Sequence, residues 1–278
     1  MQVQPLPRFM GIWAHPDDEA FLSAGTMARA TTHGHPVAIV CATRGEAGEI
    51  ADPSLATPET LGQVRERELR AACAAVGVTD VSFLDYVDGH LPEADSGEAV
   101  GRIVYHLRRF RPDVVLTFPP NGGYGHVDHM AINRLALAAV RAAADPARYP
   151  EHGLPPHRVR KVYYGAISRE RLVAMREEAR KQGNDFLPGG NAATIPFEEM
   201  GMPEAAVTTV ITLDDTEFAA KRNALAAHAT QMPADTPWAQ ATPEQLRQAM
   251  GVESFQLVAP PVSDRAYPTP EDDVFAGL

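Results

Sequence analysis

Four continuous apolar runs, each followed by a segment with helical spacing, constrain the fold of this 278-residue chain most strongly. The runs cover residues 9–14, 36–43, 81–86 and 113–118, and the helical segments cover residues 18–32, 61–76, 97–110 and 126–144. Strands that are apolar along their whole length are typically buried on both faces, and strands that alternate with helices favour parallel pairing. The pattern predicts an α/β fold whose mostly parallel sheet is covered by helices on both faces.

The second half of the chain is less regular. A fifth strand is predicted over residues 159–167. Residues 182–203 are rich in Gly, Pro and Asn and predict a loop that is long enough to form a lid. The remaining predicted elements are helices over 169–181, 216–230 and 242–250, strands over 207–213 and 255–258, and an extended tail from residue 260. We expect one domain over residues 1–278, with a core of about 1–165 and, over about 166–278, a variable region that shapes the pocket and carries C-terminal helices.

Charge and composition exclude several classes of partner. The chain has 25 basic and 36 acidic residues, a formal charge of −11, and no block of Lys or Arg, which argues against nucleic acid or an anionic membrane as partner. No apolar run is long enough to span a bilayer, and residues 1–7 lack the features of a secretion signal. The two cysteines, Cys41 and Cys73, lie in apolar segments and are expected to be buried thiols, so a reducing cytoplasm is the expected location.

Polar loops follow all four predicted strands. His15, Asp17 and Asp18 come directly after the first strand, residues 44–49 after the second, Asp85 and Asp88 after the third, and residues 119–126 after the fourth. In an open parallel sheet, ligand sites lie just beyond the carboxyl ends of the strands. Since these loops are expected to meet at one edge of the sheet, the sequence predicts a single polar site there.

The residue types in these loops suit a metal-dependent hydrolase. A catalytic zinc ion usually has three protein ligands and one open position, and His15 and Asp18 are close enough in sequence to bind one ion. His126 and His129 are three residues apart at the start of a helix, so either of them can complete the set. Asp17 remains free to act as a base, which together with the ligands indicates hydrolysis of an amide or ester.

Three further side chains suit the stabilisation of a tetrahedral oxyanion. A protonated His126 supplies positive charge, and Tyr124 offers a hydroxyl group. Asp128 is placed to orient a histidine from behind the metal ligands.

Two motifs in these loops resemble those of the PIG-L/LmbE-like N-deacetylases. The first is His-Pro-Asp-Asp-Glu at residues 15–19, after a predicted strand, and the second is Gly-His-Val-Asp-His at residues 125–129, opening a helix. The similarity covers the first 145 or so residues and continues weakly through residues 221–231. That family includes deacetylases of N-acetylglucosaminyl lipids and of mycothiol and bacillithiol precursors. The resemblance implies a Rossmann-like fold.

The resemblance also implies roles for individual residues. His15, Asp18 and His129 match zinc ligands, and Asp17 matches the general base. His126 is expected to stabilise the oxyanion or act as an acid. Asp128 would support His126, Tyr124 would polarise the substrate carbonyl, and the sugar hydroxyls would be held by Arg65, Asp88 and either Glu49 or Glu46.

These inferences give a hypothesis with two alternatives. The protein is expected to be a cytoplasmic, zinc-dependent hydrolase that removes the acetyl group from a small N-acetylglucosamine conjugate and releases acetate and a free amine. His and Asp ligands also accept Fe²⁺ or Mn²⁺. The alternatives are an amidase that acts on a thiol S-conjugate and an inactive metal- or sugar-binding protein, and a homo-oligomer is compatible with each.

Three residues near these motifs have simpler interpretations. Glu19 is interpreted as a residue of the first helical turn that complements the helix dipole. His228 is interpreted as structural. Arg65 lies in a run of alternating charges, a pattern that is usually a solvated helix face, so only the family resemblance favours a functional role for it.

Overall fold

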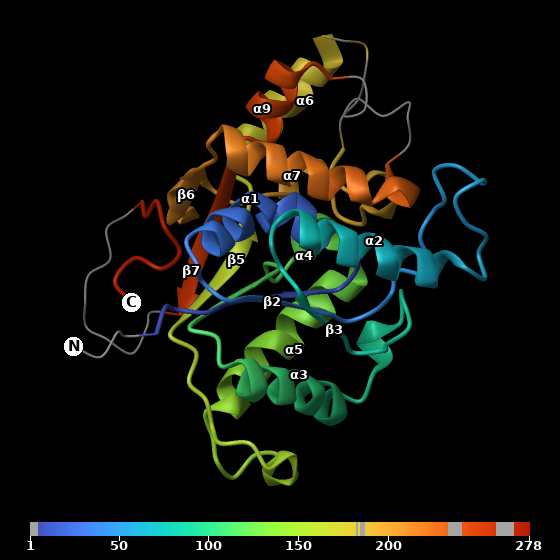
Figure 1. Ribbon diagram of the computed structural model, residues 1–278. Helices are drawn as coiled ribbons and strands as arrows, with labels where there is room; N and C mark the ends of the chain where they lie inside the picture. Colours follow the sequence, from blue (N-terminus) through green and yellow to red (C-terminus); the bar gives the residue numbers. More distant parts are fainter. Residues whose placement is uncertain (1–4, 182, 184–186, 233–240, 260–269) are drawn as a thin grey trace.

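A seven-stranded sheet forms the centre of the computed structural model of the protein (Figure 1). The structure describes residues 5–181, 183, 187–232, 241–259 and 270–278. The strands are β1 (Phe9–Trp13), β2 (Val37–Cys41), β3 (Asp80–Phe83), β4 (Val114–Thr117), β5 (Lys161–Ala166), β6 (Thr209–Thr212) and β7 (Val252–Ala259). Their order across the sheet is β3-β2-β1-β4-β5-β7-β6.

The first five strands are parallel, and β7 runs antiparallel to both of its neighbours, β5 and β6. The mostly parallel α/β sheet expected from the apolar runs is therefore confirmed. The strand predicted over residues 255–258 is twice as long in the structure. Its first half, Val-Glu-Ser-Phe, has two polar residues in the middle, so it lacks the continuous apolar run that marks a buried parallel strand.

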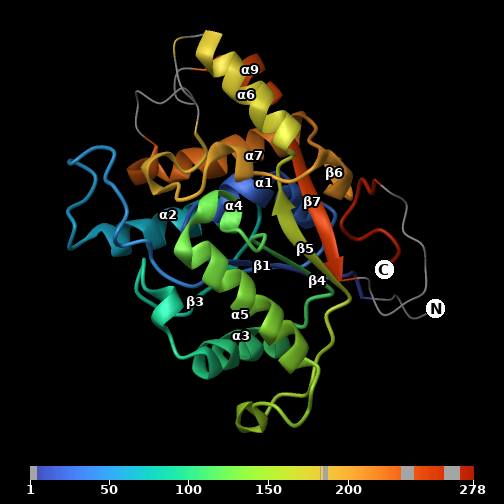
Figure 2. The same cartoon turned by 180° about the vertical axis from the view of Figure 1, so that it is seen from behind.

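Helices cover both faces of the sheet, as predicted. In Figure 1, α1 (Asp18–Thr32), α2 (Leu61–Ala75) and α7 (Asp215–Ala227) lie above the sheet, and α3 (Ser96–Phe110) and α5 (Val127–Ala143) lie below it. Figure 2 shows the same two layers from behind, with α6 (Arg169–Lys181) and α9 (Pro243–Met250) beyond α7. The short helices are α4 (Gly122–Gly125), η1 (Leu91–Glu93), η2 (Pro150–His152), η3 (Gly190–Ala192), η4 (Phe197–Glu199), η5 (Glu204–Ala206) and η6 (Ala229–Gln231).

The core lies between the sheet and these two helical layers. β1 is buried along its whole length, with Phe9 and Trp13 fully inaccessible to solvent. Burial of a large apolar side chain contributes about 1.5–3 kcal/mol. Cys41 and Cys73 are buried free thiols, as expected. Among the residues that the structure describes, no helix is long and apolar enough to cross a membrane.

The tail and the long loop of the second half of the chain both contact the core of the structure. The tail was expected to be extended from residue 260. Residues 260–269 lie outside the described residues, but residues 270–278 fold back on the sheet, where the buried Glu271 pairs with Lys161 at 2.7 Å. In the expected loop, residues 182 and 184–186 lie outside the described part. Its later portion contacts the loop after β4, where Thr194 N–H donates to the carbonyl of Tyr124 at 3.0 Å.

Candidate active site

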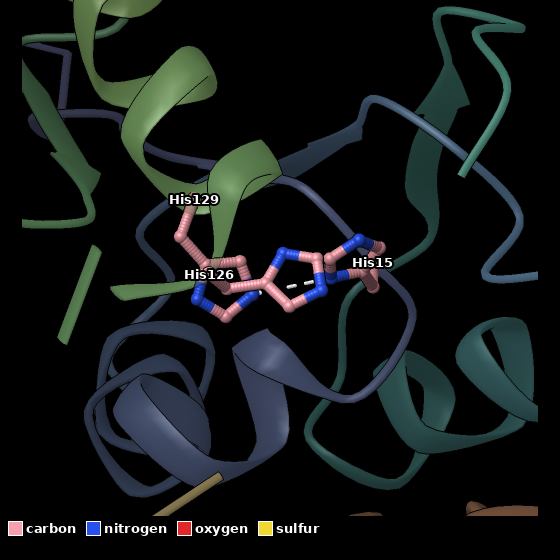
Figure 3. A group of neighbouring side chains, drawn as sticks. All are labelled: His15, His126 and His129. Atoms are coloured by element: carbon pink, nitrogen blue, oxygen red, sulfur yellow. Dashed lines mark hydrogen bonds between the residues drawn. The ribbon is translucent and has the colours of Figure 1, made fainter. Parts of the chain in front are cut away.

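The loops after β1, β3 and β4 meet at the carboxyl edge of the sheet. β1 pairs with both β2 and β4, so the residues that follow β1 lie at the centre of this edge. Figure 3 shows the imidazole rings of His15, from the β1–α1 loop, and of His126 and His129, from the start of α5, turned toward one another. The predicted convergence of the loops at one edge is thus found for the histidines that follow β1 and β4.

Three candidate metal donors lie close together in this cluster. His15 Nδ1 is 3.1 Å from His129 Nε2, and the carboxylate of Asp18 lies 3.9 Å from His15 Nδ1 and 3.4 Å from His129 Nε2. All three residues are buried. Zinc bonds of 2.0–2.2 Å in a tetrahedral arrangement require donors roughly 3.3–3.6 Å apart. The separations therefore suit a single small cation.

Neighbouring groups fix the protonation of both rings. His129 Nδ1 lies 3.0 Å from the carbonyl oxygen of Gly122, and His15 Nε2 lies 2.9 Å from Asp88 and 3.2 Å from Asp128. These acceptors require a hydrogen on each of the two nitrogens, so His15 Nδ1 and His129 Nε2 direct lone pairs at each other. A proton or a cation must lie between two such acceptors at 3.1 Å.

His126 occupies a different position in the cluster. His15, His126 and His129 form a second group of donors within 4.8 Å of one another, but His126 is only half-buried. Its Nδ1 accepts the backbone N–H of Asp128 at 3.2 Å, which leaves the hydrogen on Nε2. Because a protonated nitrogen cannot bind a metal, this tautomer favours His129 over His126 as the third donor and gives His126 a free N–H.

Asp128 is placed differently from the expectation that it supports His126. It is fully buried, and its carboxylate accepts from Gly89 N–H at 2.7 Å, from Leu91 N–H at 3.1 Å and from His15. Only its backbone N–H contacts His126. Because the side chain points toward the loop after β3, Asp128 orients His15, a histidine on another element.

The electrostatics of the cluster follow from burial and pairing. Burial lowers the pKa of His15, but hydrogen bonds to Asp128 and Asp88 outweigh it and raise the pKa to about 10. Burial raises the pKa of Asp88, but the hydrogen bond from His15 outweighs it and lowers the pKa to about 2. Burial raises the pKa of Asp18 to about 8 against the opposing charge of His15. Burial also lowers the pKa of His129 well below its usual range. Without a bound metal, His15 thus carries the proton that lies between its Nδ1 and His129 Nε2.

Asp17 has a rare backbone conformation for a residue with a side chain. Its φ of 109° and ψ of −28° lie in the left-handed region, immediately before α1. Such conformations cost about 1–3 kcal/mol and persist where the surrounding structure enforces them. The side chain is 19% exposed and one oxygen lies 3.1 Å from the guanidinium of Arg65. Asp17 is therefore accessible to solvent, and its carboxylate is held by Arg65.

Arg65 is buried, so the alternative of a solvated helix face is wrong for this residue. Its guanidinium donates to the carbonyls of Gly45 at 2.7 Å and Pro16 at 2.6 Å, as well as to Asp17. The close approach depends on Gly45, whose φ is +66° and whose missing Cβ would overlap the guanidinium. Arg65 thereby joins α2 to the loops after β1 and β2.

The remaining predicted substrate residues differ in their placement. Asp88 is buried and accepts from Ala47 N–H at 3.1 Å in addition to its contact with His15. Glu46 accepts from Asp88 N–H at 3.1 Å, and its second carboxylate oxygen is buried without a partner among the described residues. Glu49 is exposed and contacts Gln231 through its backbone carbonyl. The structure therefore brings Glu46, rather than Glu49, to Asp88.

Tyr124 lies half-buried on α4 with its ring edge-on to His129, at a centroid distance of 5.0 Å. Burial raises the pKa of its hydroxyl, which keeps the group neutral and able to donate. The hydroxyl is thus chemically suited to the role that the family resemblance implies.

Four residues behind the site were missed or assigned only local roles. Glu19 and His228 form a buried pair with a separation of 2.8 Å. The carboxylate of Glu68 accepts both the N–H and the hydroxyl of Thr230, at 2.8 and 2.6 Å. Each pair joins residues more than 160 positions apart in the chain. No local sequence pattern therefore indicates that these side chains meet.

Comparison with known proteins identifies the family of the chain. Residues 10–140 match the family model described as PIG-L, GlcNAc-PI de-N-acetylase. A 1D-myo-inositol 2-acetamido-2-deoxy-alpha-D-glucopyranoside deacetylase from Streptomyces avermitilis is 37% identical over 303 residues, which cover 100% of this chain and 99% of the relative. The chain belongs to the PIG-L family of deacetylases. A mycothiol S-conjugate amidase from Streptomyces coelicolor is 32% identical, covering 98% of this chain and 97% of the relative.

The fold of this PIG-L family member is also found in solved structures. N,N'-diacetylchitobiose deacetylase from Pyrococcus horikoshii superimposes with a TM-score of 0.67, covering 91% of this chain and 84% of that one at 22% identity. At this identity the comparison concerns the fold, and it agrees with the α/β architecture predicted from the sequence.

The contact between Gly45 and Arg65 can be tested by stability measurements. Gly45→Ala is expected to destabilise the protein by the roughly 1–2 kcal/mol of left-handed strain plus about 1–3 kcal/mol of overpacking against Arg65. Gly89→Ala is the matched control, since its φ is +80° but nothing lies within 4 Å of the added Cβ. Urea denaturation measures both losses, and equal values would show that Arg65 moves away freely.

Proposed function

We propose that this protein is a zinc-dependent N-deacetylase that acts on an N-acetylglucosamine-type conjugate. The observation that carries the proposal is the pair of imidazole lone pairs that face each other beside the carboxylate of Asp18, the residue that follows Asp17 in the chain. A cation between these donors satisfies all of them. A binding protein without catalysis would need the donors but would have no use for a strained, partly exposed Asp17.

The residues that would hold the metal are His15, Asp18 and His129. Their donor separations fit a small divalent ion, and the hydrogen bonds to Gly122, Asp88 and Asp128 fix both imidazole tautomers. When bound, such an ion supplies Lewis acidity that makes water a better nucleophile and polarises a carbonyl group. Zinc suits this donor set best, and Fe²⁺ or Mn²⁺ also accept it.

In the proposed reaction, Asp17 takes a proton from water as the water oxygen bonds to the acetyl carbon. The Nε2–H of His126 donates a hydrogen bond to the carbonyl oxygen while negative charge develops there, and the hydroxyl of Tyr124 adds a second donor. Asp17 then passes the proton it took from water to the amine nitrogen, the C–N bond breaks, and acetate and the free amine leave. Asp128 holds His15 in place during these steps.

The choice of substrate is supported by the relatives, whose names specify a glucosaminyl-inositol deacetylase and a mycothiol S-conjugate amidase. Asp88, Arg65 and Glu46 place polar groups at the edge of the cluster where sugar hydroxyls would bind, while Glu49 points outward. The amidase is the second candidate because that relative is also similar over nearly the whole chain. We place the enzyme in the cytoplasm, in keeping with its two buried free thiols.

The substrate assignment is tested by measuring acetate release from N-acetylglucosaminyl-inositol with added Zn²⁺. We expect turnover that is lost with a chelator and restored by metal. A parallel assay with a mycothiol S-conjugate measures release of the glucosaminyl-inositol amine. A higher kcat/KM for the S-conjugate would favour the amidase, and inactivity toward both substrates would contradict the proposal.

Asp17→Asn is expected to retain the metal and lose turnover by about 10²–10⁴-fold, because a general base contributes a factor of that size. Steady-state kinetics and metal analysis on the same preparation check this result. Asp145→Asn, a change of the same kind at an exposed position, is the control and should leave kcat unchanged. Full activity of Asp17→Asn would show that another group accepts the proton.

His129→Ala is expected to lose bound metal, since it removes the ligand that faces His15 Nδ1. The metal content of the purified protein, measured by elemental analysis, gives the result directly. His33→Ala removes an exposed histidine at the end of α1 and should keep the metal. An unchanged metal content in His129→Ala would refute the ligand assignment.

A further inference from the structure

The left-handed backbone of Asp17 is held by contacts on two sides. On one side Arg65 binds the side chain of Asp17 at 3.1 Å and the carbonyl of Pro16 at 2.6 Å. On the other side the backbone N–H of Asp17 donates to Glu19 Oε2 at 3.0 Å. Because this second contact acts on the peptide group itself, it bears directly on φ of Asp17.

Glu19 is fixed in turn by a residue from the far end of the chain. Its other oxygen, Oε1, lies 2.8 Å from His228 Nε2, and each side chain is 1% exposed. Burial lowers the pKa of His228, but the pairing with Glu19 outweighs it and raises the pKa. Burying two charged groups is expensive, and an apolar pair of similar volume would stabilise a helix contact at least as well. Packing alone therefore does not explain this pair.

His228 is itself anchored independently of Glu19. It lies directly after α7, and two residues later Thr230 binds Glu68 of α2 through both its N–H and its hydroxyl. The carbonyl of Thr230 accepts from Ala51 N–H at 2.8 Å. The segment after α7 is thus tied to α2 and to the loop after β2, and it presents His228 to Glu19 from a fixed position.

We infer that Glu19 and His228 form a positioning pair that holds the peptide group of Asp17 in its left-handed conformation and so aims its carboxylate. The inference rests on the proposed role of Asp17 as the base. Neither residue touches the substrate in this account. Their contribution lies in the orientation of Asp17, and it requires the C-terminal part of the chain.

The test compares three variants of the full-length protein. His228→Leu removes the partner of Glu19 and is expected to lower kcat by about 10–100-fold, the loss associated with a misplaced catalytic group, with KM and zinc content unchanged. His228→Gln keeps a donor near the position of Nε2 and is expected to restore most of kcat. Lys221→Met breaks another buried ion pair, the 2.7 Å contact between Lys221 of α7 and Glu253, and should lower stability without changing kcat.

A second readout is independent of turnover. In the metal-free and the zinc-loaded protein, the amide proton of Asp17 should shift upfield in His228→Leu, because its hydrogen bond to Glu19 weakens, and should stay in place in Lys221→Met. If His228→Leu does not fold, His228→Asn, whose amide is too short to reach Glu19, repeats the test with a polar side chain.

The outcomes separate this inference from the proposed function. An unchanged Asp17 amide shift together with unchanged kcat in His228→Leu overturns the positioning role. An equal loss of kcat in Lys221→Met also overturns it, because general destabilisation would then suffice. A wild-type protein that releases no acetate contradicts the proposed function, while the amide shift still decides whether the pair holds Asp17.

Discussion

Two imidazole nitrogens that direct lone pairs at each other across 3.1 Å, with a carboxylate 3.4 Å from one of them, are the centre on which the site depends. Such an arrangement is stable only with positive charge between the donors. The sheet makes it possible, because β1 and β4 are parallel neighbours and bring His15 and His129 together across 114 residues of chain. The buried acids Asp88 and Asp128 behind His15 keep its second nitrogen occupied.

Around this centre, charge is balanced by groups from several elements. Arg65 of α2 offsets Asp17 and at the same time joins the loops after β1 and β2, which explains why this charged side chain is buried. Asp88 and Asp128 offset His15. The polar site therefore depends on how the surrounding helices are placed against the sheet edge. At Gly45 the approach is so close that an added Cβ would overlap the guanidinium of Arg65.

The sequence is sufficient for the parts of the structure that follow from local pattern. Continuous apolar runs identify the parallel strands, and the polar residues at their ends predict that His15 and Asp18 lie near His126 and His129. Only the family resemblance selects His129 as the third ligand. Residue partners across long separations are not encoded locally. The pattern of α2 gives no sign that Arg65 turns inward, because alternating charges look alike whether or not a buried carbonyl lies opposite. The same applies to the tail, where the buried Glu271 pairs with Lys161, 110 residues earlier in the chain.

Glu19 illustrates the limit most clearly. An acid in the first helical turn complements the helix dipole, and this local role accounts for Glu19. No neighbouring residue in the sequence indicates a further role. Its actual partner is 209 residues away. The metal donors come entirely from the first half of the chain, so holding a cation does not require α7. Holding Asp17 in a conformation that costs free energy does require a fixed acceptor behind its peptide group. The second half of the chain fixes that acceptor, because His228 binds Glu19. Orientation of Asp17 as the proposed base therefore accounts for the Glu19–His228 contact, which metal binding does not explain.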